Sequence, residues 1–315
     1  MDFFAILRPL EIVVADIMVV WHTMLTWLGM SSDSGATWAL SIVGLVVTIR
    51  VILIPLFVKQ IKASRAMQMI APELKAVQAK YKGKKDQASR EAMSRETMEL
   101  YSKHKTNPFS SCLPMLVQAP IFFALFRVLN GELKDDAAGI GWLTAELARE
   151  ANSATLFGAN LSDTFIKADG NIQVQIVAAL LIVMMVATTF LTQHQLTRKN
   201  MPASALEGPM AQQQKVLMYI LPFIFVISGP NFPIGVLIYW ATTNLWTMGQ
   251  QFYVIRRNPT PGSDAEKAHK LRLAAKAARK GTPLIDSSDP EHPVIEAPQP
   301  PRQREQPKKK PRKKR

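Results

Sequence analysis

Arg50 is the residue with the clearest chemical potential, because it stands inside the apolar run TIRVILIPLFV at residues 48–58. It follows Trp38 by 12 residues and precedes Lys59 by 9, which in a helix correspond to about 18 Å and about 13 Å. A guanidinium keeps its charge at physiological pH, and an ionisable side chain within a bilayer usually faces a cavity. The spacing predicts a permanent cation that attracts an anionic group. Snorkelling of Arg50 to the cytoplasmic interface remains the alternative.

Other polar side chains in apolar segments are candidates to share this cavity. Gln118 and Gln193 stand in the runs at 111–130 and 173–193. For Gln118, a cavity role and hydrogen bonding between helices both remain open. A third apolar run carries Thr242, Thr243 and Asn244. For these three we favour helix–helix hydrogen bonds, which are common in membranes and contribute about 0.6 kcal/mol each.

The sequence does not indicate enzymatic chemistry. Cys112 is the single cysteine, so a disulfide framework or a multi-cysteine metal site within the chain is excluded. The histidines lack helical or finger spacing; they are His22, His104, His194, His269 and His292. Neither G-x-x-x-x-G-K-[ST] nor G-x-G-x-x-G occurs. We therefore predict a protein that is not an enzyme, with no catalytic residue, no metal and no cofactor.

The elements that must position these groups are apolar segments separated by basic ones. A helix needs about 20 apolar residues to cross a bilayer, and Lys and Arg near span ends stay in the cytoplasm. The loop 59–109 carries 12 Lys and Arg against 5 Asp and Glu, whereas 131–171 carries 3 against 7. We predict an all-α membrane protein with an extracytoplasmic loop at 131–172 and five spans, at about 36–58, 111–130, 173–193, 216–229 and 233–254.

Two further segments are predicted to be helical without crossing the membrane. Residues 1–30 interrupt an apolar sequence with charge, and a carboxylate at the bilayer centre costs roughly 2.5–3.5 kcal/mol. We favour an amphipathic helix in the outer interface, with a sixth span as the alternative. In the loop 59–109, good helix formers fill 64–82 and 86–103 around a turn at 81–84. A cytoplasmic helical hairpin is expected there.

Three stretches carry a resemblance to a known family. They are TIRVILIPL, then NPFSSCLPMLVQAPIFFALFRVL from Asn107, and PIGVLIYWATTNLWTMGQQF from Pro233. Distributed in this order over about residues 36–255, they resemble the YidC/Oxa/Alb family of membrane protein insertases. The absence of a cysteine or a large outer domain near the start is similar to actinobacterial-type short members of the family.

The resemblance implies a five-helix core enclosing a hydrophilic groove that is open to the cytoplasm and to lipid. Arg50 matches the family's groove arginine, which attracts the polar segment of an incoming protein. Phe122, Tyr239 and Trp240 match aromatics on the path of the apolar segment. Trp240 departs from the family's usual tyrosine pair, so a role that needs a hydroxyl group at that position is in doubt.

The C-terminal residues 256–315 are predicted to form a basic cytoplasmic tail. A short basic helix is expected at 265–280 and a disordered linker at 281–300. Basic runs bind both phosphate backbones and anionic lipid headgroups, and the resemblance implies a ribosome as partner, with no specific DNA binding. The residues assigned to this contact are Lys308, Lys309, Lys310, Arg312, Lys313, Lys314 and Arg315.

The function expected is insertion and chaperoning of nascent membrane proteins in a bacterial plasma membrane, alone or with the Sec translocon. Two alternatives remain. A secondary transporter or ion pathway would use Arg50 for an anionic solute, although such proteins usually contain repeats, and none is visible between the halves. A membrane-anchored ribosome tether would leave Arg50 and Gln118 without a purpose.

Overall fold

The computed structural model describes most of the chain, namely residues 3–84, 86–107, 113–129, 139–201, 209–280, 284–285 and 294–295. The predicted all-α fold class is confirmed, because helices dominate and the only strands in these ranges are pairs of two residues. Three of the described helices are long and apolar enough to cross a membrane. They are α1 (Phe3–Trp27), α2 (Gly35–Ile52) and α8 (Ile172–His194) with its continuation to Lys199.

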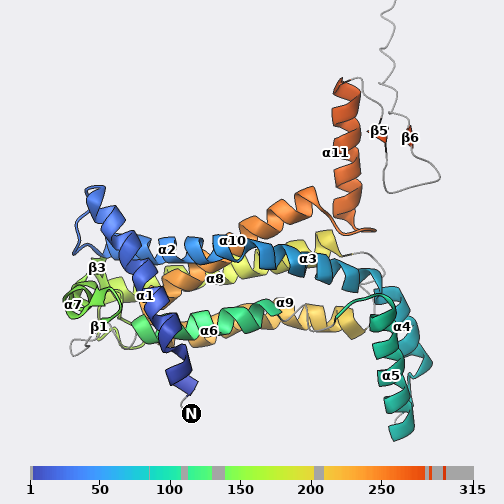
Figure 1. The fold of residues 1–315 in the computed structure, drawn as a ribbon, viewed down its shortest axis with the longest axis horizontal. Helices are drawn as coiled ribbons and strands as arrows, with labels where there is room; N and C mark the ends of the chain where they lie inside the picture. Colours follow the sequence, from blue (N-terminus) through green and yellow to red (C-terminus); the bar gives the residue numbers. More distant parts are fainter. Residues whose placement is uncertain are drawn as a thin grey trace, which may run out of the picture.

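The long helices form an elongated bundle (Figure 1). α10 (Ile234–Arg257) packs against both α2 (Gly35–Ile52) and α8 (Ile172–His194), and α9 (Pro209–Ser228) packs against α8. α6 (Leu113–Arg127) lies on the same side of the bundle as α9. The core between the helices is apolar, and its largest fully buried side chains include Trp38, Met185 and Leu237.

These helices coincide with the five segments predicted as spans, but only α2 and α8 are among the described helices long and apolar enough to cross by themselves, while α6 and α9 contain shorter apolar stretches, Leu116–Arg127 and Met218–Asn231. α10 is not among the helices that are apolar enough by themselves, since it carries Thr242, Thr243, Asn244 and Gln250. The segment 36–58 is divided at Leu53, where α2 ends and α3 (Ile54–Met69) begins. Pro55 explains the break, because its ring clashes with the carbonyl four residues earlier. The number of spans remains a prediction.

In the segment predicted as a hairpin, α4 (Ala71–Lys80) and α5 (Gln87–Lys103) pack against each other, but the first predicted helix, 64–82, is divided at Ile70 between α3 and α4. The cytoplasmic placement of the hairpin stays a prediction. Gly83 takes a positive φ of 87° in the turn, which glycine adopts without strain. Asp86 caps α5 by accepting a hydrogen bond from the Ser89 amide at 2.9 Å. The hairpin projects from one end of the bundle (Figure 1).

A small folded cap covers the opposite end of the bundle (Figure 1). The sequence predicted only a loop here, whereas the structure contains β1 (Gly139–Ile140), β2 (Leu143–Thr144), α7 (Ala145–Ser153), β3 (Thr155–Leu156) and β4 (Ala159–Asn160). The cap touches α2 so closely that a Cβ atom on Gly35 would lie 2.3 Å from the Thr155 backbone. Only a glycine fits at that contact.

α1 (Phe3–Trp27) lies obliquely across α2 and α6, near the capped end (Figure 1). Its two carboxylates face protein: Glu11 is 1% exposed and pairs with Arg127, and Asp16 accepts a hydrogen bond from the Trp142 amide at 2.6 Å. The desolvation cost that counted against burial of these carboxylates is therefore offset by partners. The interfacial placement stays a prediction, and the length and composition of Leu7–Trp27 keep a sixth span open.

Beyond α10 the chain forms α11 (Asp264–Lys280), which agrees with the predicted basic helix. Within the segment predicted as a disordered linker, β5 (Leu284–Ile285) pairs with β6 (Val294–Ile295). Both dipeptides are apolar and contain β-branched residues, which favour strand pairing. The seven basic residues predicted to contact the ribosome, Lys308 to Arg315, lie outside the described residues.

Candidate functional site

Arg50 occupies the last turn of α2 and is only 6% exposed. Its guanidinium lies over the Phe57 ring, 5.1 Å from the ring centroid, and it is close enough to Tyr239 for electrostatic interaction. Among the described residues, no carboxylate forms an ion pair with Arg50. A buried cation without a counter-ion is costly, so this site retains an attraction for an anionic group.

Gln118 and Tyr239 meet on the α6 side of α10. The Gln118 amide Nε2 donates a hydrogen bond to the Tyr239 hydroxyl, and Tyr239 is 2% exposed. Two roles were left open for Gln118, namely hydrogen bonding between helices and a place in a cavity. Its side chain forms a hydrogen bond between two helices, and the same bond brings it to the tyrosine that neighbours Arg50. Gln193 is half-buried near the end of α8, and its place in a groove stays a prediction.

The predicted aromatics form a continuous cluster between α6 and α10. The Phe122 and Trp240 rings stack with centroids 4.9 Å apart and an interplanar angle of 3°. Phe225 and Phe232 contact Trp240 edge to face, at 5.6 Å and 4.8 Å. The indole at 240 is therefore used for ring packing, which needs no hydroxyl group.

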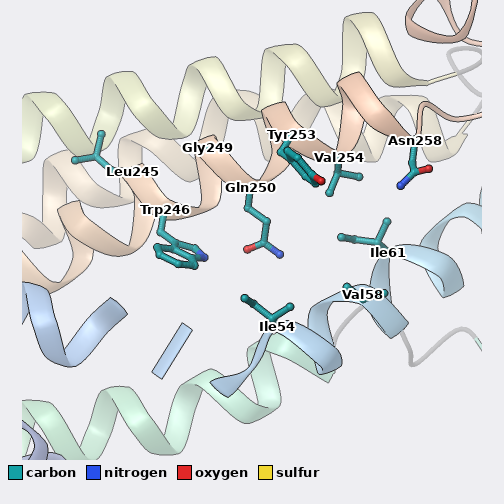
Figure 2. A pocket seen from close by; sticks show the side chains of 10 residues that line it. All are labelled: Ile54, Val58, Ile61, Leu245, Trp246, Gly249, Gln250, Tyr253, Val254 and Asn258. Carbon is teal, nitrogen blue, oxygen red and sulfur yellow. The ribbon is translucent and has the colours of Figure 1, made fainter. Parts of the chain in front are cut away.

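A pocket of about 600 Å³ lies between α3 and α10, beginning one turn after Arg50. Figure 2 shows side chains from the two helices facing one another across it, with Ile54 opposite Trp246 and Gln250. The wall is mostly apolar and is completed by Val58, Ile61, Leu245, Gly249, Tyr253, Val254 and Asn258. Neither Arg50, Gln118 nor Gln193 lines this pocket, so the hydrophilic groove remains a prediction.

Sequence reasoning missed the residues of this pocket and the ring beneath Arg50. A signal was available in their spacing, since Ile54, Val58 and Ile61 recur at helical intervals, as do Trp246, Gly249, Gln250 and Tyr253. Phe57 also stands at a helical interval from Arg50, seven residues later, although their contact runs across the break at Leu53.

The fold and the site define a multi-pass helical membrane protein in which a buried arginine, without a carboxylate partner among the residues described, lies near an apolar pocket. The family described as "60Kd inner membrane protein" matches residues 29–261. A relative from Streptomyces avermitilis, named membrane protein insertase YidC, is 49% identical over 250 residues, or 77% of this chain and 56% of the relative. The chain therefore belongs to the 60Kd inner membrane protein family, which is the family of the YidC relatives.

Further relatives match over most of their length and carry the same name, membrane protein insertase YidC. One from Tropheryma whipplei (strain Twist) is 40% identical over 85% of this chain and 89% of its own. One from Bifidobacterium longum is 35% identical, over 90% and 86% respectively. A crystal structure described as an active YidC insertase with its first transmembrane domain resolved aligns at 21% identity and a TM-score of 0.49, over 76% of this chain and 46% of that chain.

Proposed function

We propose that this protein inserts nascent membrane proteins into a bacterial plasma membrane, and that Arg50 receives the acidic or polar segment of the client. The observation that carries the proposal is that Arg50 is only 6% exposed and has no carboxylate partner in the described chain. A client carboxylate would supply the missing counter-ion, since a charged partner stabilises a desolvated cation far more than an exposed one.

The aromatic cluster is the proposed path for the apolar segment of the client. Phe123 on α6 is 42% exposed beside the stacked Phe122 and Trp240 rings. An apolar segment that slides along this face gains about 25 cal/mol for each Å² it removes from water. No covalent step is required, so the transfer is driven by burial in lipid.

The proposed topology places the hairpin and the C-terminal tail in the cytoplasm and the small cap outside. The charge balance of the two loops supports this orientation. The proposed partners are the ribosome through the tail, the Sec translocon, and anionic lipids.

The test uses vesicles that contain the full chain with Arg50, Arg50→Lys or Arg50→Gln, and two stalled single-span clients that differ only in an acidic or neutral outer segment. Insertion of the acidic client should fall about tenfold or more with Arg50→Gln and be largely retained with Arg50→Lys. A photocrosslinker at the exposed position 123 should react with both clients.

Equal losses for the acidic and neutral clients would refute the role of Arg50 as an anion receptor. Loss of the crosslink, with ribosomes still bound, would favour the tether. Transport of a small anion that depends on Arg50, without insertion, would favour the transporter.

A further inference from the structure

A second pocket, of about 450 Å³, lies where the ends of α8 and α10 meet the start of α11. α8 continues there as a π-helical segment, Gln195–Lys199. Three cations line the pocket, one from each element: Lys199, Arg256 and Arg272. Phe252 and Ile255 contribute an apolar wall, and Asp264 is the single carboxylate in the lining.

Hydrogen bonds hold the three elements together around the pocket. Arg272 Nη2 donates to the Arg256 carbonyl oxygen at 3.1 Å, which leaves its other guanidinium donors for a ligand. The loop between α10 and α11 is fixed by the Thr260 amide, which donates to Asn200 Oδ1 at 2.9 Å. The site is therefore built in advance and does not depend on a ligand to assemble it.

The charge of the pocket is largely uncompensated. Asp264 is already engaged by Lys267, 3.1 Å from its carboxylate. In the described part of the chain, neither Lys199 nor Arg256 forms an ion pair. A phosphate group satisfies such a set of donors, since guanidinium and ammonium groups both bind it well.

The surroundings favour a lipid phosphate over that of a nucleic acid. α11 starts near the hairpin end of the bundle and projects away from it, roughly perpendicular to the long helices (Figure 1), and so lies parallel to a membrane that the bundle crosses. It carries six Lys and Arg against two Asp and Glu, and it exposes Leu271 and Leu273. This is the composition of a helix at a lipid interface. Phe252, 54% exposed, offers an apolar surface beside the cations.

We propose that this pocket binds the phosphate headgroup of an anionic phospholipid of the cytoplasmic leaflet, with Lys199, Arg256 and Arg272 as its ligands and Phe252 beside the acyl chains. The assignment of the leaflet rests on the topology under the proposed function, but binding itself does not require insertion activity. Bound lipid would hold α11 on the membrane surface. Basic pockets between helices at the cytoplasmic face are typical sites for anionic headgroups.

The test measures lipid retained by the full chain in detergent, using phosphatidylglycerol, phosphatidylcholine, glycerol phosphate and a short RNA as probes. Each neutralised cation, in Lys199→Gln, Arg256→Gln or Arg272→Gln, should weaken phosphatidylglycerol binding about fivefold. The matched control is Lys276→Gln with Arg279→Gln, which removes charge from α11 outside the pocket and should have little effect. Asp264→Asn should tighten binding, a gain that a folding defect does not produce.

Equal weakening by pocket and control variants would overturn the proposal, because binding would then depend on overall charge. If glycerol phosphate binds as strongly as the lipid, the acyl chains add nothing to binding, and the proposed contact with Phe252 is refuted. RNA binding that depends on the three cations, without lipid binding, would assign the pocket to a nucleic acid. If binding follows the expected order but insertion is absent, the lipid site stands and the proposed function fails.

Discussion

The contact between α1 and α6 predicts an asymmetric response to mutation. Arg127 Nε lies 2.5 Å from Glu11 Oε1, and Arg8 lies 3.5 Å from the other carboxylate oxygen. The Glu11 side chain is 1% exposed, whereas the Arg127 side chain is 41% exposed. Loss of one partner therefore has different consequences, because the whole Glu11 carboxylate is buried, whereas Arg127 buries its Nε but keeps much of its side chain exposed.

Arg127→Gln leaves a buried carboxylate with the longer Arg8 contact alone. We expect a loss of about 3 kcal/mol in the free energy of unfolding, at the lower end of the range for a broken buried pair. Glu11→Gln leaves an arginine whose exposed part water can solvate and whose buried Nε can still donate to the new amide oxygen, so a loss of about 1 kcal/mol is expected. The double variant should lose less than the sum, with a coupling of about 1–2 kcal/mol.

The assay is equilibrium or thermal unfolding of the four proteins in one detergent, with helix content as a check of the folded state. A larger loss for Glu11→Gln than for Arg127→Gln would refute the reasoning from burial. Strict additivity would show that the two side chains do not interact in the folded protein.

Two further predictions concern packing and pH. Gly44→Ala should lower the free energy of unfolding by about 1–3 kcal/mol, because the new Cβ would lie 2.3 Å from the Trp21 ring. Gly249→Ala, in open space on α10, should instead raise it by up to about 1 kcal/mol. Unfolding of both variants in detergent measures the difference. The Ser89 amide bonded to Asp86 holds the pKa of that carboxyl below its ordinary value. A depressed pKa contributes stability that is complete above the unfolded value of about 3.9 and is lost as the pH falls through the folded value. Hydrogen exchange in the first turn of α5 should therefore accelerate only below about pH 4. The acceleration should be much smaller in Asp86→Asn, because asparagine still caps the helix and does not titrate. Acceleration already at neutral pH, or an equal acceleration in the variant, would contradict the role of the Asp86 carboxylate.

Much of the helical layout could be predicted from patterns along the chain. Apolar runs and basic loops identified the helices now seen as α2, α6, α8, α9 and α10, and composition identified the hairpin and α11. Arg50 and the aromatics were found through a local motif or a family resemblance. The strands of the cap could not be predicted in the same way, because segments of two residues are too short to carry periodicity.

The partners of individual side chains were beyond the reach of a linear pattern. Gln118 and Tyr239 are 121 residues apart, yet they share a hydrogen bond. The polar residues of α1 suggested a helix with a water-facing side, but Glu11 and Asp16 face protein partners instead. Periodicity shows which residues share a face of a helix, and it does not show what that face will meet.

The sequence by itself determined that this protein is helical and membrane-embedded, because segregation of apolar and charged residues follows directly from the cost of burying polar groups in lipid. It also determined that a permanent cation stands among the apolar residues of α2. Only the tertiary structure decided that this cation has a ring and a phenol beside it but no carboxylate in the described chain. It also decided that three separate helical segments bring Lys199, Arg256 and Arg272 around one pocket. Those outcomes depend on contacts between distant segments, which arise when the helices pack.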